Sequence, residues 1–151
     1  MKTETIKTLH LLFVDDDSDE SYLFNEALEQ TGLDIKLSKA TDGNDFIAFL
    51  SSNPLPDMVL IDLNMPHKDG LEALSEIRNI PAFNKLPLVI YSTTKNKTFV
   101  DQCYQKGANL FIVKPNNFDG MVEVVKIVCS INWSEFDQPA REEFVINPLT
   151  S

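Results

Sequence analysis

The amino-acid sequence predicts an α/β fold: a doubly wound, five-stranded parallel sheet with helices on both faces. Two observations lead to this prediction. Short apolar runs alternate with longer amphipathic segments along most of the chain. Several of these runs are apolar at consecutive positions, a pattern typical of parallel strands that are buried on both faces. The chain has 151 residues, a length typical of a single domain.

The first predicted strand covers residues 9–14 and ends at a run of aspartates. A helix is expected next, with Ser18 as a candidate N-cap and acidic residues in its first turn, where the helix dipole favours them. We expect Asp17 to cap this helix rather than to bind a metal. Gly32 is expected to stop the helix. The second strand, at residues 35–38, is weaker because apolar residues there alternate with Lys and Ser.

The middle of the chain repeats the same pattern. A turn at residues 41–43 leads into a short amphipathic helix, and a continuous apolar run at 58–61 predicts a buried third strand. Asp62 follows this strand directly. The next helix is expected to end near Asn79, and the fourth strand is expected at residues 88–91.

The last two units complete the predicted sheet. A more polar helix is expected at about residues 97–106, and the fifth strand at 110–113 is followed by Lys114. The final helix is expected to begin after Asn117 and to reach about residue 131.

The chain is expected to divide into three parts: an N-terminal extension (1–7), one folded domain (8–132) and a C-terminal tail (133–151) with no output domain after it. We expect Trp133 and Phe136 of the tail to pack back on the final helix, because an exposed aromatic pair would be a liability in a monomer.

Composition narrows the classes of function. The chain has 23 acidic and 13 basic residues, a formal net charge of −10, which argues against direct binding to nucleic acid or to an anionic membrane. Cys103 and Cys129 lie among apolar residues and are expected to be buried thiols, so a zinc site of the usual kind is not expected. No signal peptide or membrane-spanning run is recognisable, so a cytoplasmic location is expected.

Polar residues follow four of the predicted strands: Asp15 and Asp16, Asp62, Ser92, and Lys114. If the strand order is 2-1-3-4-5, the three aspartates converge at one edge of the sheet, where clustered carboxylates repel each other and need a cation. Oxygen ligands of this kind suit Mg²⁺. Taken singly, each residue has a structural alternative as a turn residue, cap or surface charge. Their joint position at one sheet edge favours a site.

The sequence resembles response-regulator receiver domains. The resemblance rests on three segments in order: Val14-Asp15-Asp16, the run Asp62-Leu63-Asn64-Met65-Pro66 with Gly70 beyond it, and Phe111-Ile112-Val113-Lys114-Pro115. It covers about residues 8–132. The resemblance, rather than the spacing of the segments, implies the strand order 2-1-3-4-5 of the flavodoxin-like receiver fold.

The resemblance also implies roles for individual residues. Asp62 would be the phosphoacceptor that receives a phosphoryl group from a sensor histidine kinase or a histidine phosphotransfer protein. Asp16, Asp62 and the backbone carbonyl of Asn64 would bind Mg²⁺, and Asp15 would contribute through a water molecule. Lys114 would neutralise charge on the phosphoryl oxygens. A cis bond between Lys114 and Pro115 would help to aim the lysine.

A further set of residues would connect phosphorylation to a signal. In the family, a hydroxyl residue after the fourth strand, here Ser92, moves toward the phosphoryl group, and an aromatic residue in the fifth strand, here Phe111, turns inward. This changes the surface formed by the fourth helix, fifth strand and fifth helix. The resemblance also implies that Asn64 and Thr94 occupy variable positions that the family uses to tune dephosphorylation. Phe111 lacks the hydroxyl of the commoner Tyr.

The protein is therefore expected to be a single-domain response regulator that catalyses only its own phosphorylation and dephosphorylation. It would act on an unidentified downstream protein as a monomer or weak homodimer.

The main alternative is an interaction module that keeps the fold without using phosphate. The sequence of such a module would be expected to lack one of the acids, the acceptor or the lysine. A phosphatase-type hydrolase would need a second acid at Asn64. A flavin binder would need a phosphate-binding loop after the first strand, where Asp15-Asp16-Asp17 repels phosphate.

Overall fold

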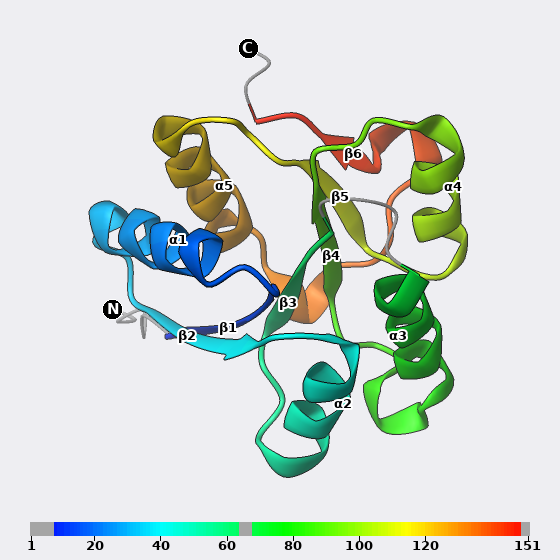
Figure 1. Cartoon of the computed structure of the whole chain (residues 1–151). Helices are drawn as coiled ribbons and strands as arrows, with labels where there is room; N and C mark the ends of the chain where they lie inside the picture. The colour runs from blue at the N-terminus through cyan, green and yellow to red at the C-terminus, as the bar shows by residue number, and fades with distance from the viewer. Residues whose placement is uncertain (1–7, 64–67, 149–151) are drawn as a thin grey trace, which may run out of the picture.

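The structure is a computed structural model that describes residues 8–63 and 68–148. Its centre is a parallel sheet of six strands in the order β2-β1-β3-β4-β5-β6 (Figure 1). The strands are β1 (Leu9–Val14), β2 (Ile35–Ala40), β3 (Met58–Asp62), β4 (Leu88–Ser92), β5 (Leu110–Val113) and β6 (Val145–Ile146). The α-helices are α1 (Ser18–Thr31), α2 (Gly43–Ser52), α3 (Lys68–Asn79), α4 (Lys97–Gln105) and α5 (Phe118–Ser130).

The helices form a layer on each face of the sheet. Helices α1 and α5 cover one face, and α2, α3 and α4 cover the other (Figure 1). Each interface encloses its own apolar cluster, and alternate residues of β1, β3, β4 and β5 contribute to one cluster or the other. The predicted α/β class, the parallel sheet and the order of its first five strands are confirmed.

Helix boundaries follow the local capping chemistry. Asp17, rather than Ser18, is the N-cap of α1: its Oδ1 accepts hydrogen bonds from the backbone N–H groups of Asp19 and Glu20. Ser18 is the first residue inside the helix. Gly32 ends α1 in a left-handed conformation (φ 68°), which glycine adopts without the steric cost that a Cβ would add.

The C-terminal segment corrects the predicted strand count. Residues 145–146 form a sixth strand that pairs in parallel with β5, with Phe111 opposite Val145. Sequence periodicity could not reveal a strand of this length, because an alternating pattern needs about four residues to be recognised. The packing of the tail aromatics is confirmed: Trp133 is buried, and its Nε1–H donates to the carbonyl oxygen of Val128 in α5 at 2.8 Å.

Of the helices that the structure describes, none is both long and apolar enough to cross a bilayer.

Candidate functional site

Backbone hydrogen bonds align the predicted site residues along one edge of the sheet. The N–H of Asp15 donates to the carbonyl of Ala40, just beyond the end of β1. In the same way the N–H of Lys114 donates to the carbonyl of Ser92. Val14 lies opposite Ile61 in the β1–β3 register, so Asp15 and Asp62 occupy neighbouring positions at the carboxyl ends of these strands.

Strand alternation places four of the polar side chains on the same face of this edge. Phe13, Leu60, Val89 and Ile112 belong to the cluster under α1 and α5. Because side chains alternate along a strand, the residues two positions later point to the same face: Asp15, Asp62, Tyr91 and Lys114. Ser92 has the opposite parity and belongs to the α2–α3–α4 face.

An ion-pair network centres on the ammonium group of Lys114. Its Nζ lies 2.7 Å from Oδ1 of Asp62 and 3.0 Å from Oε1 of Glu20 in α1. It also lies 5.5 Å from the centroid of the Tyr91 ring, which is within cation–π range. Asp62 and Lys114 are both buried, whereas Glu20 is partly exposed. The lysine therefore connects β5, β3 and the first turn of α1.

The carboxylate of Asp62 is poorly compensated. Neither of its oxygens makes a hydrogen bond within the part of the chain that the structure describes, and only Oδ1 has the ion pair with Lys114. Burial raises the pKa of Asp62 to about 8; Lys114 acts against this shift, and the nearby charges of Asp15 and Glu20 reinforce it. A buried carboxylate oxygen without a partner is a place where a ligand can supply the missing interaction.

Asp15 is the second buried acid of the edge. Its oxygens accept from the N–H of Asp17 at 3.0 Å and from the hydroxyl of Ser21 at 3.3 Å. Burial raises its pKa, and the charge of Glu20 adds to this, whereas the hydrogen bonds and Lys114 lower it. Asp16 is exposed beside it. Among the described residues, no group of three or more His, Cys, Asp and Glu side chains is placed to hold a metal ion.

Lys114 reaches Asp62 without the expected cis peptide bond. No cis bond occurs in the described chain, so the bond between Lys114 and Pro115 is trans, and this expectation was wrong. Burial lowers the pKa of Lys114, but the carboxylates of Asp62 and Glu20 offset this, so its net pKa is raised and the lysine stays charged. The position of Lys114 after β5 and its ion pairs with Asp62 and Glu20 orient its side chain toward the site.

The predicted hydroxyl and aromatic residues lie on the other face. Ser92 is fully buried, and its Oγ accepts from the N–H of Thr94 at 3.3 Å. Phe111 is also fully buried, with its ring centroid 6.1 Å from that of Phe99 and 6.3 Å from that of Phe144. The predicted contribution of Asn64 lies outside the described residues.

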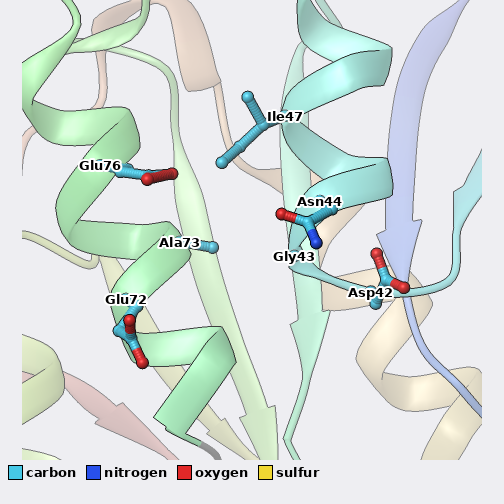
Figure 2. Close-up of a pocket in the computed structure, with 7 residues that line it drawn as sticks. All are labelled: Asp42, Gly43, Asn44, Ile47, Glu72, Ala73 and Glu76. Carbon is cyan, nitrogen blue, oxygen red and sulfur yellow. The ribbon is translucent and has the colours of Figure 1, made fainter.

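Two hollows lie on the α2–α3–α4 side. One of about 360 Å³ between α4, β5 and the C-terminal segment has Phe111 among its apolar lining residues and Lys95, Lys97 and Arg141 among its basic ones. The other, of about 200 Å³, lies between α2 and α3, where Ile47 and Asn44 face Ala73 and Glu76 (Figure 2). This second hollow contains none of the predicted site residues.

Sequence reasoning missed two members of the site, Glu20 and Tyr91. For Glu20 the sequence pattern indicates only a favourable interaction with the helix dipole, because its partner Lys114 is 94 residues away. Tyr91 lies in the run at residues 88–91 that predicts the fourth strand, and that pattern indicates no role in the site. Strand parity could have placed Tyr91 on the same face as Asp62 and Lys114.

Comparisons with known proteins agree with this geometry. The family model described as the response regulator receiver domain matches residues 11–126. Response regulator Rcp1 of Synechocystis is 32% identical over 131 residues, covering 83% of this chain and 88% of Rcp1. The structure of the Mn²⁺-bound form of Rcp1 has a TM-score of 0.71 and 30% identity over 87% of this chain and 99% of that one. The structure of the phosphorylated cyanobacterial phytochrome response regulator RcpA has a TM-score of 0.73 and 28% identity, over 85% of this chain and 96% of that one.

The chain belongs to the response regulator receiver domain family of two-component signalling. Receiver domains bind Mg²⁺ or Mn²⁺ at an acidic phosphorylation site and take phosphoryl groups from histidine kinases. The residues present here fit a divalent cation. The buried Asp62 oxygen without a hydrogen-bond partner and the neighbouring Asp15 offer the hard oxygen ligands that Mg²⁺ prefers, and this ion keeps several of its waters.

Proposed function

We propose that this protein is a single-domain response regulator that accepts a phosphoryl group on Asp62. The observation that carries the proposal is the buried carboxylate of Asp62, paired with Lys114 through Oδ1 and without a hydrogen-bond partner on either oxygen in the described structure. A nucleophile needs a lone pair that is not already engaged in a hydrogen bond, and the adjacent lysine supplies a positive charge for the phosphoryl oxygens.

The transfer chemistry follows from these positions. The phosphorus–nitrogen bond of a donor phosphohistidine breaks as an oxygen of Asp62 bonds to phosphorus, and the donor imidazole takes up a proton. Lys114 holds the acceptor before transfer and neutralises phosphoryl charge afterwards. Asp16, Asp62 and the carbonyl of Asn64 would hold Mg²⁺, with Asp15 acting through water. The bound cation would screen charge between the acceptor and the phosphoryl group.

We infer that the signal leaves through the α4–β5–α5 surface. Phe111 supports this inference because it lines the hollow between α4 and the C-terminal segment while its strand leads directly to Lys114. Ser92 begins the connection to α4, since its hydroxyl already accepts from Thr94. A change at Ser92 or Lys114 would therefore reach the lining of this hollow. Asn64 and Thr94 would set the rate of dephosphorylation.

The test is chemical modification by a small phosphodonor. The native protein, incubated with acetyl phosphate and Mg²⁺, should gain one phosphoryl mass, and Asp62→Asn should gain none. Lys114→Met should react more slowly than the native protein at equal Mg²⁺. Modification of native protein and Asp62→Asn to the same extent would contradict the role of Asp62. A native protein that is never modified would favour the phosphorylation-independent interaction module instead.

A further inference from the structure

The first turn of α1 places a third carboxylate against Lys114. Glu20 lies on the face of the sheet that carries Asp15 and Asp62, and its Oε1 is 3.0 Å from Nζ of Lys114. Its side chain is only partly exposed, so solvent screens this pair less than it screens a surface ion pair. Asp19, its neighbour in the same helical turn, is exposed and makes no ion pair among those identified in the described structure.

The position of the ammonium group reflects attraction from both sides. Glu20 attracts Lys114 toward α1, and Asp62 attracts it toward β3, so the lysine contacts one oxygen of Asp62. The other oxygen of Asp62 keeps no hydrogen-bond partner within the described residues. Without Glu20, the pull toward α1 would be lost and the attraction of Asp62 for the lysine would be less opposed. A tighter lysine pair would compete with a cation for the same carboxylate, because both are bound by its lone pairs.

We propose that Glu20 is a positioning residue that holds Lys114 partly away from Asp62 and so keeps this carboxylate available to Mg²⁺ and to the phosphodonor. The proposal rests on the function proposed for Asp62. Glu20 would act through Lys114 and would touch neither the metal nor the phosphoryl group.

The test compares four proteins by the Mg²⁺ concentration that gives half-maximal modification by acetyl phosphate. In Glu20→Gln and Glu20→Asp this concentration should rise about fivefold, since one variant loses the charge and the other shortens its reach. Asp19→Asn is the matched control: it removes a charge from the same helical turn without touching Lys114, and it should shift the value less than about twofold. At saturating Mg²⁺ the modification rate should return to that of the native protein in all three variants.

A double-variant cycle tests whether Glu20 acts through the lysine. In the Lys114→Met background, Glu20→Gln should change the Mg²⁺ requirement no more than Asp19→Asn does. Equal effects of Glu20→Gln and Asp19→Asn in the native background would overturn the proposal, because they would show a general charge effect. An undiminished effect of Glu20→Gln in the Lys114→Met background would overturn it too.

The cycle also separates this proposal from the proposed function. Thermal unfolding in EDTA measures the coupling between Glu20→Gln and Lys114→Met without metal or phosphodonor. A favourable coupling supports the contact between the two side chains, and the absence of coupling overturns it. If the coupling is present but Asp62 is never modified, the contact between Glu20 and Lys114 is supported and the proposed function is contradicted. The role proposed for Glu20 is then contradicted as well, because it depends on that function.

Discussion

The acidic edge of the sheet and the C-terminal segment are built on opposite principles. At the acidic edge, burial raises the pKa of both Asp15 and Asp62, the charge of Asp15 raises that of Asp62 further, and Asp62 lacks any hydrogen bond in the described structure. In the C-terminal segment, residues 138–146, polar side chains make hydrogen bonds to the rest of the fold. Gln138 donates to the carbonyls of Tyr104 and Ala108.

The C-terminal segment also buries a large apolar side chain. Phe144 is fully buried, and its ring lies 4.9 Å from that of Tyr104 and 6.3 Å from that of Phe111. Its carbonyl accepts from the N–H of Phe111 at 3.0 Å, and Arg141 pairs with Asp101 at 2.7 Å. The difference indicates that this segment stabilises the fold, whereas the acidic edge lowers stability until a ligand compensates its charges.

The largest expected effect is in the C-terminal segment. Phe144→Ala should lower the free energy of unfolding by about 3 kcal/mol, because it removes a buried ring and leaves a cavity beside Phe111. Urea unfolding measures this change. Phe118→Ala is the matched control, since the same deletion at a partly exposed ring should cost much less. Equal losses in the two variants would show that the segment is not docked on the sheet.

The next effect is expected at the acidic edge, where the cost of burying Asp62 outweighs the offset from Lys114. The folded-state pKa of Asp62, about 8, lies above the value of an exposed aspartate. The folded protein therefore binds a proton that the unfolded chain has released, and stability is lost as the pH rises from about 4 to about 8.

Asp62→Asn removes this loss. In EDTA, the difference in free energy of unfolding, variant minus native, should increase as the pH rises through this window. Chemical denaturation at a series of pH values measures this difference. A difference that stays constant or reverses would show that the burial of Asp62 is not costly.

The sequence predicted most of the elements that carry the site. Continuous apolar runs located β3, β4 and β5, and the strand-end rule brought Asp15, Asp62 and Lys114 to one edge. The capping of α1 was harder to predict, because Asp17 and Ser18 are adjacent and both have suitable oxygens.

The contacts that sequence reasoning missed are those made between distant parts of the chain. Glu20 pairs with a lysine 94 residues away, and no local pattern encodes that distance. β6 has two residues, so its strand identity comes from pairing with β5 rather than from periodicity. Phe144 reaches the core through the same pairing. Such contacts depend on the assembled sheet.

The most direct test of the acidic edge as a cation site is thermal unfolding of the native protein and Asp16→Ala across a Mg²⁺ titration. A cation that binds only the folded state stabilises it by about 2.7 kcal/mol at a hundred times its Kd. The native Tm should therefore rise steadily with Mg²⁺, and the Asp16→Ala Tm should stay constant. A native protein whose Tm does not respond to Mg²⁺, or an Asp16→Ala variant that responds equally, would contradict the account.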